Sequence, residues 1–203
     1  MFVDLDPQTL NLDPSLLERA ITTRTRAIIV VHTFACPAEL SRILQIARRH
    51  GLFVSEDACE AIGAEYEGQK VGALGDVGVF AFDPNKQITT GEGGAVVTNN
   101  PEIATKIRKL RNQGRDDSEQ WFQHAELGYN YRISDINCAL GIEQLNRIDA
   151  ILDRRESIAR RYGQILRCNP DLKLPPTTLR LPRISWFVYV VRLGNRFNQA
   201  HRS

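Results

Sequence analysis

The chain has 203 residues, of which 42% are hydrophobic, so it can form one full domain and part of a second. Its 26 Lys and Arg residues nearly balance its 24 Asp and Glu residues, and the formal net charge of +2 argues against the broad basic surface of a nucleic-acid-binding protein. No apolar run has the length of a membrane span, the four histidines show no metal-ligand spacing, and the four cysteines contain no CxxC pair. We therefore expect a cytoplasmic protein with reduced thiols that binds neither membrane, nucleic acid nor metal.

The first part of the chain predicts a strand, a helix and a second strand. Residues 27–31 (AIIVV) are almost all β-branched, which is typical of a strand buried on both faces. An amphipathic helix is expected over residues 37–49, with Gly51 as its C-terminal stop, and residues 52–55 predict the next strand. This succession implies two parallel strands joined by a right-handed crossover. Residues 1–7 look like a strand already in progress.

The middle of the chain predicts two strands joined by a loop that carries a lysine. Residues 66–72 have the composition of a surface hairpin or turn, and residues 77–82 and 95–98 predict strands. Asn-Pro at the start of residues 100–112 supplies the N-cap and first-turn proline that a helix prefers.

The last part of the chain predicts a long helix and one more strand. Residues 114–126 are polar, and we expect a mobile segment there, whereas residues 134–166 have apolar side chains at helical spacing. A proline-rich linker then leads to a predicted strand over residues 186–193. We expect a large domain over residues 1–166, and a linker with the first strand of a second domain over residues 167–203.

Two residues with functional chemistry follow predicted strands. Asp57 comes after the strand that ends at Ser55, and Lys86 comes after the strand that ends near Phe82. Ligands in open α/β sheets bind beyond the carboxyl ends of the strands. An amine and a carboxylate held there suit pyridoxal 5′-phosphate (PLP), because the lysine can form a Schiff base and the acid can keep the pyridine nitrogen protonated.

Simpler interpretations of the same residues remain open at this point. A lysine after a strand is most often a solvated loop charge, and an aspartate there is most often a helix cap. The glycines of residues 91–94 could instead hold a phosphate, but Ala95 follows them where a P-loop needs Gly-Lys-Ser/Thr, and no third glycine completes a dinucleotide pattern.

Five segments together resemble the DegT/DnrJ/EryC1/StrS family of PLP-dependent aminotransferases. They cover nearly the whole chain in the family's order: residues 3–11, 55–64 (SEDACEAIGA), 80–94 (FAFDPNKQITTGEGG), 127–135 (LGYNYRISD) and 140–145. The resemblance implies an α/β fold, namely part of the large domain of a fold-type I PLP-dependent aminotransferase. Its sheet would be mostly parallel and flanked by helices, and it would be followed by the start of a smaller C-terminal domain.

The resemblance also implies roles for individual residues. Lys86 matches the lysine that forms the internal aldimine and moves the proton during catalysis. Asp57 matches the partner of the pyridinium nitrogen, and Glu60 stands where the family usually has a glutamine near the cofactor's ring oxygen. Asn130 matches an asparagine that reaches the phosphate of the partner subunit's cofactor. His32 matches a histidine near the active site, and Arg132, in the loop of Asn130, is a second candidate contact to substrate.

The implied reaction transfers an amino group, usually from glutamate, to a nucleotide-linked keto sugar in a homodimeric enzyme. Family members that instead remove a sugar hydroxyl have histidine in place of the lysine, so Lys86 argues against that reaction. The resemblance places the N-terminal segment that binds the PLP phosphate before residue 1, and most of the C-terminal domain after residue 203. One alternative is therefore a truncated, catalytically silent fragment that binds PLP or only pairs with a subunit, and we expect an exposed hydrophobic flank on the sheet.

Overall fold

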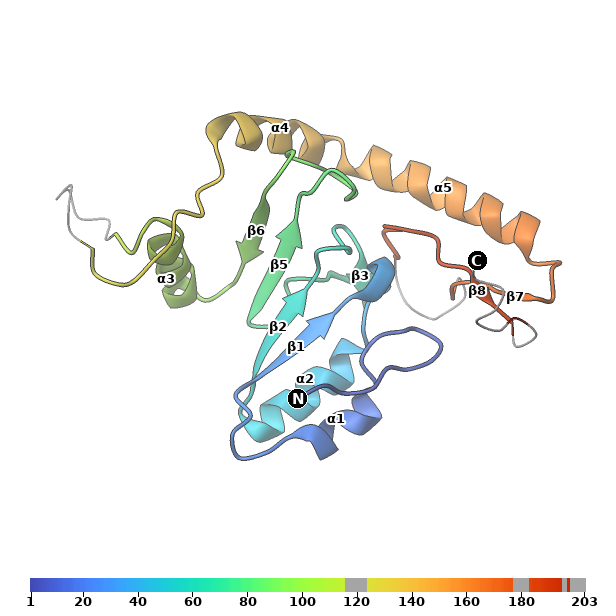
Figure 1. The fold of residues 1–203 in the computed structure, drawn as a ribbon, viewed down its shortest axis with the longest axis horizontal. Helices are drawn as coiled ribbons and strands as arrows, with labels where there is room; N and C mark the ends of the chain where they lie inside the picture. Colours follow the sequence, from blue (N-terminus) through green and yellow to red (C-terminus); the bar gives the residue numbers. More distant parts are fainter. Residues whose placement is uncertain (116–123, 177–182, 195–196, 198–203) are drawn as a thin grey trace.

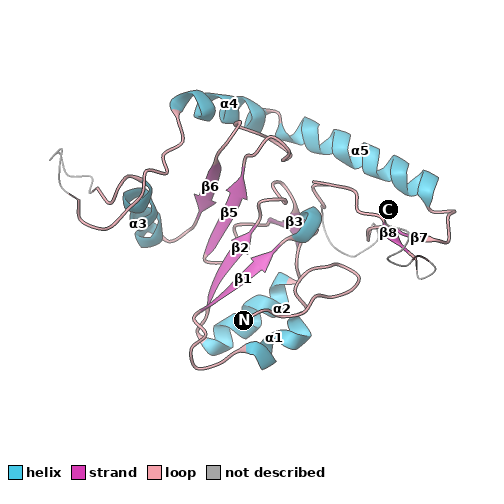
Figure 2. Cartoon of the chain, in the orientation of Figure 1, coloured by secondary structure: helices cyan, strands magenta, loops and turns pink. Residues whose placement is uncertain are grey.

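The computed structural model describes residues 1–115, 124–176, 183–194 and 197 (Figure 1). The described residues contain both helices and strands, as expected for an α/β protein: helices separate the first two strands, whereas five strands and then three helices follow one another in the middle of the chain (Figure 2). The helices are α1 (Pro14–Ala20), η1 (a 3₁₀ helix, Thr33–Ala35), α2 (Leu40–His50), α3 (Pro101–Arg111), α4 (Asp135–Asn146) and α5 (Ile148–Leu166). The strands are β1 (Ala27–Val31), β2 (Phe53–Asp57), β3 (Glu65–Tyr66), β4 (Gln69–Lys70), β5 (Val77–Ala81), β6 (Gly94–Val97), β7 (Leu172–Lys173) and β8 (Arg192–Leu193).

The main sheet has the strand order β1-β2-β5-β6. β1, β2 and β5 are parallel, and β6 runs antiparallel to β5. The predicted fold class, a mainly parallel sheet with flanking helices, is confirmed. The parallel pairing expected for the first two strands is also confirmed, with β1 and β2 joined through α2.

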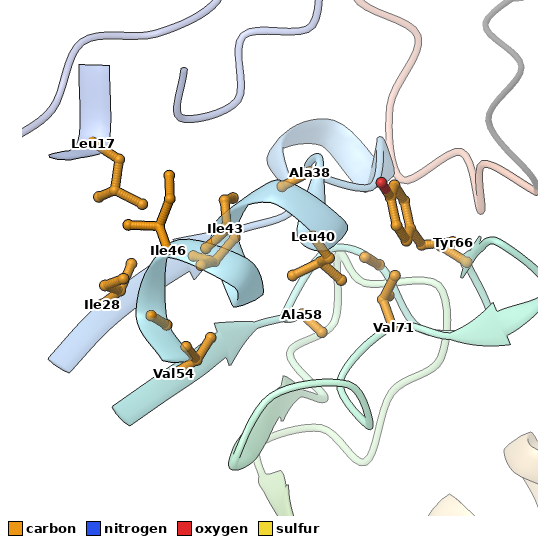
Figure 3. Packing of buried hydrophobic residues seen from close by; sticks show 14 residues of the cluster. Leu17, Ile28, Ala38, Leu40, Ile43, Ile46, Val54, Ala58, Tyr66 and Val71 are labelled. Carbon is orange, nitrogen blue, oxygen red and sulfur yellow. The ribbon is translucent and has the colours of Figure 1, made fainter. Parts of the chain in front are cut away.

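One face of this sheet carries the hydrophobic core. Ile28 of β1 and Val54 of β2 lie beneath α2, which contributes Leu40, Ile43 and Ile46 to the same cluster (Figure 3). Val30 of β1 belongs to this cluster too. The buried residues of α2 recur at helical spacing and form one face, which is the pattern that the sequence predicted for this helix. Full burial of such a side chain contributes about 1.5–3 kcal/mol to stability, so this layer holds α2 on the sheet.

The other face of the sheet is open. Burial alternates along β1, and its exposed positions include Ile29 at 68% exposure and Val31 at 42%. The prediction that residues 27–31 are buried on both faces is therefore wrong for this chain, because no described residue covers the second face. The exposed apolar side chains of that face agree with the expected hydrophobic flank of the sheet.

Several local predictions agree with the structure. β3 and β4 form the hairpin expected near residues 66–72. The side chain of Asn100 accepts hydrogen bonds from the first turn of α3, and Pro101 is its first residue. The helix expected from residue 37 begins three residues later, at Leu40. Helix α1, which Asp13 caps, was not predicted.

Three predictions for other parts of the chain are corrected. The single helix expected over residues 134–166 is interrupted at Arg147, which separates α4 from α5. Most of the strand expected over residues 186–193 is irregular: Trp186 has φ +49°, outside the strand region, and only β8 pairs, with β7. The strand expected over residues 1–7 is absent from the structure, which has only a single bridge there, from Leu5 to Leu12.

The remaining predictions fall partly outside the described residues. Most of the polar segment 114–126 and part of the proline-rich linker lie there. The division into two domains near residue 166 stays a prediction. Among the described helices, none has the length and apolar character needed to cross a membrane.

Candidate functional site

Three strands of the main sheet end at one edge. β1, β2 and β5 run parallel and end at Val31, Asp57 and Ala81, and the loop that carries Lys86 follows β5. This edge is the usual place for a ligand in an open α/β sheet. The topology therefore brings Asp57 and Lys86, from different elements, to the same edge.

Asp57 points to the open face of the sheet. It is the last residue of β2, and the register pairs it with Val31 on one side and Val79 on the other, which pairs in turn with Val96. Residues paired side by side present their side chains on the same face, so the carboxylate stands in an apolar row. Its Oδ1 accepts the backbone N–H of Cys59 at 3.1 Å.

Burial and neighbouring charges change the pKa of the Cys59 thiol. Its pKa is raised to about 12, first by burial and then by the hydrogen bond and charge of Asp57, with a further contribution from Asp83. The positive charge of Lys86 acts in the opposite direction and lowers it. With so high a pKa the thiol stays protonated and is not a nucleophile.

The loop that carries Lys86 is closed by its own backbone. The N–H of Phe82 donates to the carbonyl of Gly93 at 2.9 Å, and the N–H of Thr90 donates to the carbonyl of Phe82 at 3.0 Å. Gly93 has φ +153°, and a Cβ there would lie 2.6 Å from Thr90 Oγ1. Within the loop, the N–H of Lys86 donates to the carbonyl of Asp83 at 3.1 Å. A glycine is therefore required where the loop closes, and the closed loop fixes the backbone of Lys86.

The Lys86 side chain meets an aromatic ring from the C-terminal part of the chain. Its Nζ lies 4.7 Å from the ring centroid of Phe187. The neighbouring Gln87 donates to the carbonyl of Glu60 and to Ser185 Oγ. Sequence analysis missed these contacts, because they join residues far apart in the chain. The one available signal was the aromatic character of residues 186–189.

Glu60 is turned toward η1. Its Oε2 accepts the backbone N–H of Phe34 at 2.9 Å, where Phe34 has the left-handed φ of +55°. The carboxylate thus supports the turn after β1, and its predicted contact with the cofactor ring stays a prediction.

His32 lies in the core. The side chain is 0% exposed, its Nε2 lies 3.0 Å from Oε2 of Glu56, and its Nδ1 accepts the N–H of Ala38 at 3.1 Å. Both ring nitrogens are engaged and the side chain is fully buried in the described residues, and the expected substrate contact of His32 stays a prediction.

Glu56 is the buried acid that holds His32. It also accepts backbone N–H groups from Gly72, Leu74 and Gly75, at 2.6, 2.7 and 2.5 Å. Burial alone would raise the pKa of Glu56, but the hydrogen bonds from His32, Gly75 and Gly72 outweigh it and hold the pKa below its usual value. This carboxylate joins β1, β2 and the loop before β5 beneath the site.

Asn130 and Arg132 lie elsewhere, beside the end of α3. Asn130 forms a bridge with Asn112, and Arg132 Nη1 donates to Asn112 Oδ1 at 2.7 Å. Both are exposed, and neither shares a hydrogen bond or ion pair with Asp57 or Lys86 in the described part of the chain. A role for Asn130 across an interface stays a prediction.

Metal binding has no support at this edge or elsewhere in the described ranges. No group of three or more His, Cys, Asp or Glu side chains there is arranged to hold an ion.

Comparisons with known proteins identify relatives of the whole chain. The model of the DegT/DnrJ/EryC1/StrS aminotransferase family matches residues 1–203. GDP-perosamine synthase of Caulobacter vibrioides is 45% identical over 196 residues, which cover 96% of this chain and 52% of that protein.

Solved structures of PLP enzymes also match nearly the whole of this chain. Helicobacter pylori PseC, an aminotransferase involved in the biosynthesis of pseudoaminic acid, matches with a TM-score of 0.92 and 31% identity over 97% of this chain and 53% of PseC. E. coli GDP-4-keto-6-deoxy-D-mannose-3-dehydratase with bound hydrated PLP matches with a TM-score of 0.86 and 28% identity, over 95% of this chain and 53% of that one. The chain thus spans about half the length of the relatives it matches.

Proposed function

Because the chain belongs to the DegT/DnrJ/EryC1/StrS aminotransferase family, we propose that it is the cofactor-binding part of a PLP-dependent sugar aminotransferase, with Lys86 as the amine that holds the cofactor. PLP is the cofactor of this family. The observation that carries the proposal is the convergence of Lys86 and Asp57 at one sheet edge, because β2 ends at Asp57 and the loop that follows the neighbouring parallel strand β5 carries Lys86.

The residues at this edge fit PLP. The cofactor has an aldehyde that an amine can capture and a pyridine nitrogen that a carboxylate can pair with, and when bound it supplies a ring that withdraws electrons from the substrate. Lys86 supplies the amine on a closed loop, and Asp57 supplies the carboxylate on the open face.

Each residue then has a defined task. Asp57 would hold a proton at the ring nitrogen, and the apolar row of Val31, Val79 and Val96 on the same face would contact the flat ring. Lys86 Nζ would hold the cofactor covalently and would then move a proton at the substrate carbon.

The proposed substrates are a nucleotide-linked keto sugar as acceptor and glutamate as amino donor. The names of two relatives support a sugar nucleotide, since one is a GDP-perosamine synthase and another acts on GDP-4-keto-6-deoxy-D-mannose. That second relative is a dehydratase, and Lys86 favours amino transfer over dehydration here. All four cysteines are free, which supports a reducing compartment such as the cytoplasm.

We also propose that the functional unit is a homodimer. α4 supports this, because it exposes Ile136 at 83%, Ile142 at 58% and Leu145 at 46%, and Gly141 is its only buried residue. Such an apolar, exposed helix is typical of an interface. The same observation favours a second candidate function, a catalytically silent chain that serves only to pair with another subunit.

Covalent capture of PLP tests the proposed function. Wild-type chain incubated with PLP should develop a visible absorbance band, and borohydride reduction should fix the cofactor on Lys86 in peptide mass spectra. Lys86→Ala should give no band, whereas Lys70→Ala, at an exposed lysine away from this edge, should behave as wild type. If the wild type shows no modification at Lys86, the silent subunit becomes the better interpretation.

A further inference from the structure

A segment from the C-terminal part of the chain lies on the lysine loop. Residues 184–187 bring the Phe187 ring to 4.7 Å from Lys86 Nζ, within the range of a cation–π interaction. Ser185, in the same segment, is 1% exposed, so the segment is packed against its neighbours.

Gln87 connects residues 184–187 to the lysine loop by a hydrogen bond. It is 4% exposed, and its Nε2 donates to Ser185 Oγ at 3.0 Å and to the carbonyl of Glu60. One buried amide therefore joins the lysine loop, the turn after β2 and the C-terminal segment. Its Oε1 is buried too and accepts no hydrogen bond from the described residues, which costs stability and leaves the two Nε2 bonds as the contacts that hold the amide.

Helix α5 holds the segment from the other side. Arg155 Nη1 donates to the carbonyl of Trp186 at 3.0 Å and to that of Phe187 at 3.2 Å. Trp186 Nε1 donates to Glu156 Oε2, and the Trp186 ring stacks with Tyr189 at 5.6 Å. Because both the backbone and the neighbouring side chains are held, the Phe187 ring has a fixed place.

We propose that Phe187 is a positioning residue for the Lys86 amine, held in place by Gln87 and Arg155. The inference rests on the proposed function of Lys86. The ring face attracts the ammonium group and covers one side of it, so the flexible lysine side chain is directed to one place before a cofactor arrives. An aldehyde must then approach from the side that the ring leaves free.

Chemical labelling of Lys86 tests this without any cofactor. Reductive methylation with formaldehyde should modify Lys86 slowly in the wild type, with exposed Lys70 in the same sample as reference. Phe187→Leu removes the ring and should raise the Lys86 rate about two- to five-fold relative to Lys70, which is the factor that a modest cation–π attraction represents. Phe187→Tyr keeps an aromatic face and should restore the slow rate, and Val188→Ala, in the same segment, should leave it unchanged.

A measurement on the wild type covers the case in which Phe187→Leu does not fold. Because Lys86 Nζ lies over the Phe187 ring, the NMR resonances of the methylene protons next to Nζ should show an upfield ring-current shift and nuclear Overhauser contacts to Phe187. Unshifted resonances, or equal Lys86 methylation in wild type and Phe187→Leu, would overturn the proposal. Neither experiment uses PLP, so a chain that fails to capture the cofactor can still show the contact, and the two proposals fail separately.

Discussion

Glu56 and His32 form a buried pair beneath the site. The Glu56 carboxylate accepts hydrogen bonds from one imidazole and three backbone N–H groups, which occupy all four of its strong acceptor positions. A buried charge costs stability unless it is paired in this way. Through the chain connection from Glu56 to Asp57, the pair also fixes the end of β2, where the proposed cofactor contact stands.

Replacing this acid should reduce stability in a pH-dependent way. Glu56→Gln places an NH₂ group against backbone donors, so at least one buried donor loses its partner, at a cost of about 1–3 kcal/mol in the free energy of unfolding at neutral pH. The pKa of Glu56 is lowered in the folded state, so its contribution is present above the ordinary carboxyl pKa of about 4.3 and is lost as pH falls through the folded value.

Urea denaturation between neutral pH and about pH 3 measures this difference. The gap between wild type and Glu56→Gln should narrow toward acid, and Glu143→Gln, at an exposed position of α4, should stay within about 0.5 kcal/mol of wild type. A gap that stays constant with pH would show that the Glu56 carboxylate does not titrate with folding.

Among the elements, the loop between β5 and β6 has the tightest geometric requirement at the site. Two glycines in it have positive φ, but they differ in their surroundings. A Cβ at Gly93 would lie 2.6 Å from Thr90 Oγ1 and 2.8 Å from Ile133 Cδ1, whereas at Gly91 it would have no neighbour within 4 Å. The glycine-rich run therefore serves to close the lysine loop, and no phosphate-binding role is needed to explain it.

The pair of glycines offers a matched test of loop closure. Gly91→Ala should cost about 1–2 kcal/mol of unfolding free energy, from backbone strain alone. In Gly93→Ala the new methyl group also clashes with Thr90 and Ile133, so this substitution should cost about 1–3 kcal/mol more unfolding free energy than Gly91→Ala. Denaturant unfolding gives both values, and equal losses would indicate that the loop relaxes easily around position 93.

At the scale of the whole molecule, the apolar surfaces predict self-association. Wild type should sediment as a dimer, and Ile136→Asp should sediment as a monomer because it puts a charge into the proposed interface. An acid is tolerated by the helix itself there, since Ile136 lies in the first turn of α4. Ile165→Asp, on α5 and 63% exposed, serves as the control that should stay dimeric. Analytical ultracentrifugation decides between these outcomes, and a monomeric wild type would contradict the homodimer.

The sequence predicted the parts of the fold whose signals are local. The β-branched run at residues 27–31 and the Asn100-Pro101 cap each determine an element through their own chemistry, and both are found where expected. The strand expected near Phe187 failed, because Arg155 takes two backbone carbonyls of that segment and no described strand pairs with residues 186–191.

The candidate site was predictable only in part, for the same reason. Strand order brings Asp57 and Lys86 to one edge, and that order follows from the strand and helix pattern together with the family resemblance. His32 also follows a strand, but its burial depends on Glu56, 24 positions away in the chain. Contacts of this kind have no local signal and need the three-dimensional structure.

Two neighbouring acids of β2 have opposite environments, and this makes the strand intolerant of slippage. Glu56 faces the packed side and Asp57 faces the open side. A shift of β2 by one position would turn Asp57 toward the aliphatic side chains of α2 and turn Glu56 away from them. The three backbone amides of Gly72, Leu74 and Gly75 would then lose their acceptor. Alternative pairings of this strand are therefore unfavourable, so an acid on the packed face fixes the alignment of the edge that carries Asp57 and Lys86.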